Sequence, residues 1–180
     1  MKKILWLVSS LTIIAGICAA TLAYINDKTK TPIAEMKVKQ AAAAAKAVMP
    51  EGVVKVEETK LGDESAYIGK DASGKTIALA FRGSDPGGYG GDIELMVGFT
   101  PDGKVVTYKA LQSTETPGLG TKLASPEFYG QFTGKDALKP LSVTKDGGEI
   151  EAITSATITS RAVCRAVAAA AAKIAKLGVK

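Results

Sequence analysis

The hydrophobic pattern begins with one long apolar run. From Ile4 to Ile25 no residue is charged and most are apolar. A helix of about 20 such residues spans the hydrocarbon core of a bilayer. The run is longer than the roughly 7–15 apolar residues of a signal-peptide core. Residues 1–25 are therefore predicted to be an uncleaved, single-pass membrane anchor, and a cleaved signal stays open because Ala15, Ala19 and Ala20 supply small residues near a plausible cut.

The charges around this run predict its orientation. Lys2 and Lys3 precede it, and positive residues favour the cytoplasmic side. Lys28 and Lys30 follow it and weaken the asymmetry. We expect a cytoplasmic N-terminus in the cell (inner) membrane and an extracytoplasmic C-terminal domain. Lipid attachment at Cys18 is disfavoured, because the residue before it is isoleucine where an attachment box has a small residue.

Residues 26–50 are expected to be a linker and a juxtamembrane helix. Asn26 to Lys30 is a short polar linker. Thr31-Pro32 resembles a helix cap followed by proline in the first turn, and five consecutive alanines from Ala41 favour helix. Pro50 is expected to end it.

From residue 51 to residue 180 the pattern predicts one domain that opens with strands. Turn residues at Asp71 to Gly74 and at Pro101 to Gly103 separate alternating apolar segments, as in β-hairpins. A short antiparallel sheet is the best account of the middle of the chain. The predicted strands are Val53–Val56, Ser65–Ile68, Thr76–Phe81, Ile93–Phe99, Lys104–Ala110 and Leu141–Thr144.

Helices complete the predicted domain. Ser125-Pro126-Glu127 has the cap-and-proline pattern of a short helix. The C-terminal segment has helical periodicity, with an apolar stripe, and Gly178 is expected to stop it. Helices on one side of an antiparallel sheet make the fold class α+β. The stripe consists of Val163, Val167, Ala170, Ala171 and Ile174.

Composition removes several classes of function. The formal net charge is +5, but much of the excess flanks the apolar run, so the chain lacks a nucleic-acid footprint. There is no histidine, which excludes His-ligated metals and Ser-His-Asp triads. The two cysteines, Cys18 and Cys164, are too few for a cysteine metal site, and we expect Cys164 to be a small buried hydrophobe. No metal site and no catalytic side chain is predicted.

Three stretches have the residues for binding chemistry. Glycines crowd Gly87 to Ile93 and the stretch from Thr114 to Lys122, where backbone can approach a ligand closely. Five hydroxyl residues lie within Thr154 to Ser160, where the last helix is expected to begin. Such a stretch can cap the helix or hold a phosphate, because the first turn has unpaired N–H groups and the positive end of the helix dipole.

Together these stretches resemble a known family. Glu151 followed by Thr154-Ser155-Ala156-Thr157 resembles the acid-x-x-Ser/Thr-Gly-Ala-Thr signature of domains that carry FMN as a phosphoester on the final threonine. With Glu115-Thr-Pro-Gly-Leu-Gly120, Gly88-Tyr-Gly-Gly91 and one N-terminal span, the chain resembles the G subunits of Rnf electron-transport complexes. The C subunits of the sodium-pumping NADH:quinone reductase are the cousin family.

The resemblance implies roles for individual residues. Thr157 matches the threonine that bears covalent FMN, and Ala156 leaves space for the phosphate beside Thr154 and Ser155. Ser155 stands where the signature has glycine, and a side chain there restricts φ. A second, ring-contacting group is implied in the glycine-rich stretch. It consists of Glu115, Thr116, Leu119, Gly120 and Lys122.

The resemblance also implies a function. The flavin supplies the redox chemistry while the protein attaches and orients it. The chain would relay electrons within a complex that couples ferredoxin:NAD oxidoreduction to Na⁺ or H⁺ movement. Its implied partners are the other membrane subunits of the complex and a separate flavin transferase.

Three alternatives remain open from the residues. The chain could serve another respiratory or extracellular electron route as a flavoprotein. It could be a flavin-free, membrane-anchored binding module in which Thr157 only caps the helix. A hydrolase or transferase is the weakest alternative, because no paired carboxylates or activated nucleophile stand out.

Overall fold

The computed structural model describes residues 2–62 and 64–177. The chain forms two compact units, residues 1–40 and 41–180. The predicted helix stop at Gly178 lies outside the described residues. Each unit is described by itself.

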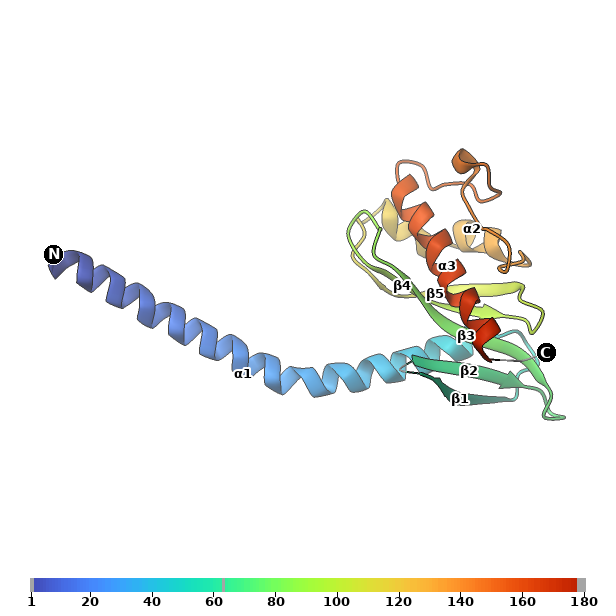
Figure 1. Cartoon of the computed structure of the whole chain (residues 1–180), viewed down its shortest axis with the longest axis horizontal. Helices are drawn as coiled ribbons and strands as arrows, with labels where there is room; N and C mark the ends of the chain where they lie inside the picture. The colour runs from blue at the N-terminus through green and yellow to red at the C-terminus, as the bar shows by residue number, and fades with distance from the viewer. Residues whose placement is uncertain (1, 63, 178–180) are drawn as a thin grey trace. The chain divides into compact units, whose positions relative to one another are not determined.

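The first unit is helical throughout its described residues. Helix α1 (Lys2–Ala47) begins there and its last turns belong to the second unit (Figure 1). Its best 18-residue window has a mean hydropathy of 2.1 and none of that window is buried, so α1 is long and apolar enough to cross a membrane.

The helix does not restart at Thr31-Pro32, contrary to our expectation. Asn26 to Lys30 is helical, and Pro32 lies inside α1. The Thr29 hydroxyl donates hydrogen bonds to the carbonyl oxygens of Ile25 at 2.8 Å and Asn26 at 3.3 Å. The polar residues 26–30 therefore do not end the helix. Their side chains are exposed, and the Thr29 hydroxyl forms its hydrogen bonds within the helix.

The second unit is built on a five-stranded antiparallel sheet whose order follows the sequence, β1-β2-β3-β4-β5. Both predicted hairpins are present, as β2/β3 and β4/β5. The first strand begins two residues later than the predicted Val53. The strands are β1 (Lys55–Leu61), β2 (Glu64–Lys70), β3 (Thr76–Asp85), β4 (Ile93–Phe99) and β5 (Val105–Ser113).

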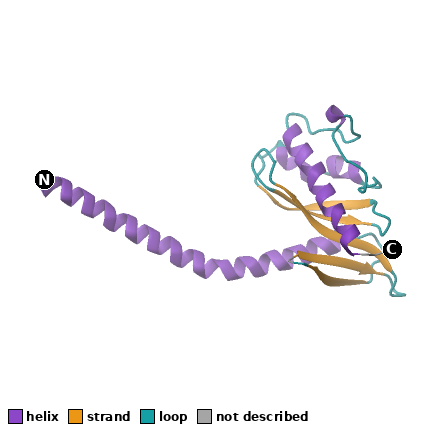
Figure 2. Ribbon diagram, viewed as in Figure 1, coloured by secondary structure: helices purple, strands orange, loops and turns teal. Residues whose placement is uncertain are grey.

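Helices cover both faces of this sheet rather than the one face we expected. Helix α3 (Thr157–Leu177) lies across one face (Figure 2), in a core that includes Phe81 and Val97. Residues 41–48 lie on the other face against Tyr67, Ala80 and Met96. Alternate residues of a strand point to opposite faces, so the continuous apolar runs Ala78–Phe81 of β3 and Leu95–Phe99 of β4 bury side chains on both.

Glycine allows α3 to approach the sheet closely. A Cβ at Gly83 of β3 would overlap the carbonyl oxygen of Ala166 in α3. All five residues of the predicted apolar stripe on α3 are buried, which confirms that prediction. Cys164 is only 2% exposed, and burial raises the pKa of its thiol to about 12, so it is a buried hydrophobe as expected.

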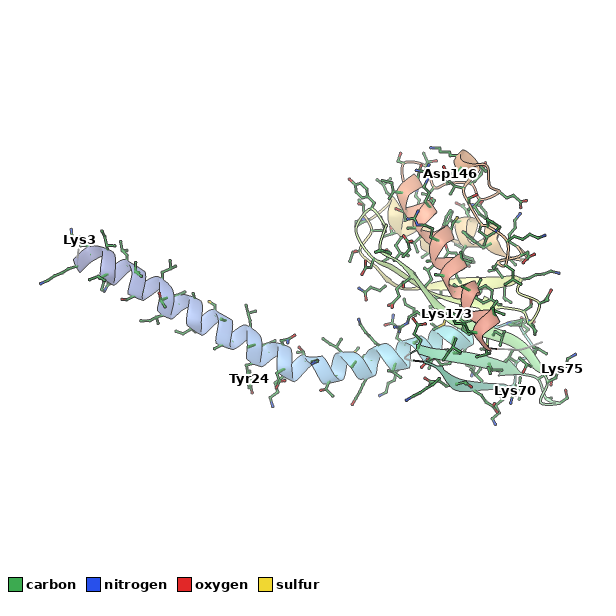
Figure 3. All side chains as sticks on the ribbon, viewed as in Figure 1. Lys3, Tyr24, Lys70, Lys75, Asp146 and Lys173 are labelled. Atoms are coloured by element: carbon green, nitrogen blue, oxygen red, sulfur yellow. The ribbon has the colours of Figure 1, made fainter. Side chains whose placement is uncertain are left out.

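Ion pairs hold both ends of α3. Figure 3 labels Asp146 beside one end and Lys173 near the other. Asp146 pairs with Arg161 in the first turns, while the Lys173 ammonium contacts Glu64 and donates to the carbonyl oxygen of Arg82 at 2.7 Å.

The remaining segments form short helical turns between β5 and α3. They are η1 (Gly120–Ala124), α2 (Pro126–Tyr129), η2 (Gly130–Phe132) and η3 (Thr144–Asp146). Helix α2 confirms the helix predicted at Ser125-Pro126-Glu127. The strand predicted at Leu141–Thr144 is absent. Val143 forms only one isolated parallel bridge, to Ile150, because the chain turns at Gly147, with φ +81°, before a second pair can form.

Candidate functional site

The start of α3 is fixed by a local hydrogen-bond pattern. The Ser160 N–H donates to the carbonyl oxygen of Ala156 at 3.0 Å, so Ala156 is the N-cap residue directly before Thr157, the first residue of the helix. The Ser160 hydroxyl accepts from the Ile153 N–H and donates to the same Ala156 carbonyl, each at 2.9 Å. The Ser160 hydroxyl therefore satisfies a backbone amide that precedes the helix. Thr157, Ile158 and Thr159 form the first turn, whose N–H groups have no intrahelical acceptor.

Ser155 makes the turn that delivers the chain into α3. Its φ is +63°, and among the described residues it is the one non-glycine residue with positive φ. Conformations of this kind cost residues with a Cβ roughly 1–2 kcal/mol. Ser155 therefore adopts a backbone conformation that glycine adopts more easily. Its Cβ makes this conformation strained.

A buried carboxylate joins three segments of the chain at this place. Glu115 is 6% exposed. Its Oε1 accepts from the Tyr89 N–H at 2.9 Å, and its Oε2 accepts from the Thr159 hydroxyl at 2.9 Å. Both donors are neutral and both bonds stabilise the charged carboxylate in a buried setting.

The glycines on either side of Glu115 are required by its position. A Cβ at Gly120 would overlap the Glu115 carboxylate, and one at Gly88 would lie 2.8 Å from its Oε1. The Thr114 hydroxyl donates to the Gly90 carbonyl oxygen at 2.6 Å, which ties the two glycine-rich loops together. These contacts explain why both loops need residues without side chains.

The loop before β4 is also tied to α3. Arg165 donates to Asp85 through Nε and Nη2, each at 2.8 Å, and this pairing lowers the pKa of the Asp85 carboxyl. Asp85 Oδ1 in turn accepts from the Gly87 N–H at 2.9 Å. The bidentate pair thereby orients the start of the loop that carries Tyr89.

Between these loops and α3 lies a cavity of about 450 Å³, within the range of small-molecule sites. Seven of the nine predicted site residues line it, together with Tyr89, Ile158 and Thr159. The seven are Glu115, Thr116, Leu119, Gly120, Ser155, Ala156 and Thr157.

The other two predicted site residues lie elsewhere. Lys122 and Thr154 line a separate hollow of about 230 Å³, where Gln131 holds the backbone of Glu151 through two hydrogen bonds. Residues three apart in a 3₁₀ helix share a face, so Gly120 and Leu123 point inward and Lys122, between them in sequence, is exposed. Thr154 precedes the sharp turn at Ser155 and is exposed outside the cavity.

Lys145 was missed by the sequence reasoning. Its Nζ donates to the Thr157 Oγ1 at 3.2 Å. No motif contains it, and its distance of 12 residues from Thr157 fits no helical or strand spacing. Tyr89 could have been predicted as a site residue from the sequence, because it is the aromatic residue inside the glycine cluster. It is 71% exposed at the cavity, where an aromatic ring can cover a planar ligand.

Known proteins resemble both the chain and its fold. A family model described as FMN-binding domain matches residues 88–172, which include both glycine-rich loops and Thr157. A crystal structure of the C subunit of the Na⁺-translocating NADH-quinone reductase from Parabacteroides distasonis has the same fold. Its TM-score is 0.54 at 18% identity, over 71% of this chain and 79% of that one.

Two curated relatives are similar over most of their length. The G subunit of the Na⁺-translocating ferredoxin:NAD⁺ oxidoreductase complex of Acetobacterium woodii is 35% identical, covering 87% of this chain and 84% of that protein. The G subunit of the proton-translocating ferredoxin:NAD⁺ oxidoreductase complex of Clostridium ljungdahlii is 37% identical, covering 86% and 80%. The chain therefore belongs to the family of G subunits of ion-translocating oxidoreductase (Rnf) complexes and contains an FMN-binding domain.

Proposed function

We propose that this protein is a membrane-anchored electron relay whose FMN is joined through its phosphate to Thr157. The observation that carries the proposal is the position of the Thr157 hydroxyl. It lies half-buried on the wall of the cavity, at the first residue of α3 and beside the Lys145 ammonium.

The residues of the cavity suit the two ends of this cofactor. The first turn of α3 offers free N–H groups and the positive end of the helix dipole, which favour a phosphate. The cavity lining is mostly apolar, with Leu119 and Tyr89 available to a flat ring system. Bound there, FMN would supply reversible electron transfer.

The protein's part is attachment, orientation and local electrostatics. Glu115 fixes the distance between the loop of Tyr89 and the start of α3, so a ligand tethered at Thr157 meets a preformed wall. A tether keeps the ligand at high effective concentration. This matters because the favourable helix-dipole contribution at an exposed site is only about 0.3–1 kcal/mol.

The proposal extends to partners, which the family supports, and to orientation, which the charges before the apolar part of α1 support. The ferredoxin:NAD⁺ chemistry named for the relatives would be performed with other membrane subunits, and a flavin transferase would load Thr157. The N-terminus with Lys2 and Lys3 lies in the cytoplasm in this proposal, and the domain lies outside. An impermeant maleimide on intact cells tests this with Lys75→Cys in a Cys18→Ser background. Labelling without lysis is expected, and labelling only after lysis would reverse the orientation.

Attachment is tested by fluorescence of the full chain on an unstained denaturing gel after co-expression with a flavin transferase. We expect a fluorescent band for the wild type and for Thr154→Ala, and a dark band for Thr157→Ala. Thr154→Ala is a matched control, because it removes an exposed hydroxyl in the same stretch that lies outside the cavity. Mass spectrometry of tryptic peptide 146–161 then identifies the modified residue. FMN on any residue but Thr157 would overturn the proposal.

A further inference from the structure

Lys145 points its charge at the hydroxyl of Thr157. The ammonium donates to Oγ1 at 3.2 Å, across 12 residues of sequence. Lys145 is on η3, outside the three stretches whose sequence indicates ligand binding. The contact between Lys145 and Thr157 therefore depends on the fold of the domain, and no sequence motif predicts it.

The turn that carries Lys145 is held firmly against α3. Asp146 accepts from Arg161 Nε at 2.7 Å and from Arg161 Nη2 at 2.6 Å. On the other side, the turn closes through the Val143 bridge to Ile150 and through Gly147 in the left-handed conformation. Lys145 thus lies on a short segment that these contacts hold next to the first turn of α3.

The positive charge of Lys145 has no carboxylate partner among residues 2–62 and 64–177. The carboxylate adjacent in sequence, Asp146, is engaged by both donors of Arg161, and this pairing lowers the pKa of the Asp146 carboxyl. A cation aimed at a hydroxyl, with no anion beside it, leaves room for a negative group on that hydroxyl.

We propose that Lys145 is a functional residue of flavin attachment, which orients Thr157 Oγ1 for phosphoester formation and then pairs with the phosphodiester charge. This inference rests on the proposed function and adds a residue to it. An ammonium donor on Oγ1 leaves the hydroxyl proton directed away from the lysine. It also stabilises the negative charge that develops on Oγ1 as the hydroxyl proton leaves, and the negative charge of the phosphate that reacts there.

The transfer balances with a flavin dinucleotide as donor. The Thr157 Oγ1–P bond forms at the flavin's phosphate, and the phosphoanhydride P–O bond breaks. AMP leaves with the bonding electrons, the hydroxyl proton goes to water, and nothing is oxidised or reduced. The product phosphodiester has one negative charge, which the Lys145 ammonium matches.

The test is a loading time course on the full chain, purified in detergent without flavin. Purified flavin transferase and FAD are added, and the fluorescent band and the intact mass are followed with time. The variants are Lys145→Met, which keeps length but removes charge, and Lys145→Arg, which restores charge. Lys139→Met is the matched control, since Lys139 is a 79% exposed lysine of the same region that contacts only Asp136 among the ion pairs.

We expect Lys145→Met to slow loading about tenfold or more, the rate equivalent of one charged hydrogen bond. Lys145→Arg should recover most of the rate, and Lys139→Met should match the wild type. The thermal midpoints of the unloaded proteins should coincide. Added salt should slow the wild type more than Lys145→Met, because screening weakens only the charged contact.

Each contrary result identifies what fails. A wild type without FMN on Thr157 overturns the proposed function and this inference with it. A wild type that loads while Lys145→Met loads equally fast overturns the role of Lys145 alone. Equal losses in Lys145→Met and Lys145→Arg, with lowered thermal midpoints in both, would assign Lys145 a structural role and also overturn it.

Discussion

Replacing Ser155 with glycine is expected to stabilise the domain, although the residue is exposed and small. The Ser155 backbone has φ +63°, a conformation that costs roughly 1–2 kcal/mol for a residue with a Cβ. Glycine removes this cost but makes the unfolded chain more flexible, which returns about 0.4–1 kcal/mol. Among the hydrogen bonds of the described residues none involves the Ser155 hydroxyl, so little else is lost. The net expectation is about 1 kcal/mol of added stability, by the difference of these two effects.

This energy corresponds to a measurable shift. The compact unit runs from residue 41 to residue 180. At about 2.1 cal/mol/K per residue, the unfolding entropy of such a unit is about 0.3 kcal/mol/K, so the midpoint should rise by about 3 °C. Far-ultraviolet circular dichroism of the unloaded full chain in detergent follows the transition. Tryptophan fluorescence does not serve, because the single tryptophan, Trp6, is in the membrane anchor.

Two controls separate backbone strain from other effects. Ser155→Ala keeps the Cβ and should gain nothing. Thr154→Gly places glycine at the neighbouring exposed position, where φ is not positive, and should lower the midpoint. A Ser155→Gly protein no more stable than Ser155→Ala would show that Ser155 is not strained, and the reasoning from its φ would fail.

Three further substitutions test the architecture by thermal or denaturant unfolding. Gly83→Ala forces a Cβ into the backbone of α3 and should cost about 3 kcal/mol, whereas Gly130→Ala, with no atom within 4 Å of the added carbon, should cost nothing. Asp85→Asn removes the carboxylate paired with Arg165, which holds the carboxyl pKa below its usual value. The wild type should therefore exceed this variant in stability above about pH 4, and the difference should vanish as the pH falls through the lowered pKa. Glu115→Gln sets an amide N–H₂ against one of two donors and should cost about 2 kcal/mol and slow flavin loading; an unchanged midpoint would contradict the joining role of this carboxylate.

The sequence was sufficient to predict a helix or strand where the apolar periodicity of that element alone determines its structure. Alternating apolar segments with glycine turns predicted both hairpins, and the stripe on the last helix predicted its buried face. It failed where the outcome depended on packing. The residues from Ala41 to Val48 cover the second face of the sheet, and alanine there indicated helix propensity but no partner.

The site was predicted in the same uneven way. Motifs predicted the glycine-rich loops and Thr157 as site residues, and parts of all three line one cavity. The direction of a side chain within a loop, however, depends on the local helix. Lys122 is in a motif and points out of the cavity, because η1 turns it away. Lys145 is in no motif and contacts Thr157, because the Asp146–Arg161 pair fixes its turn beside α3.

The burial of Glu115 indicates a structural role for this residue that its sequence motif did not predict. A carboxylate that contacts a ligand ring does not need two donors from its own chain, yet Glu115 accepts from residues 26 positions before and 44 positions after it. These two bonds make the loop of Tyr89, the loop after β5 and the first turn of α3 into one unit. Thr157, the proposed attachment residue, and the candidate ring contacts are therefore coupled through Glu115. Substitutions in any of the three segments should be non-additive, because residues that share one buried hydrogen-bond network do not contribute independently.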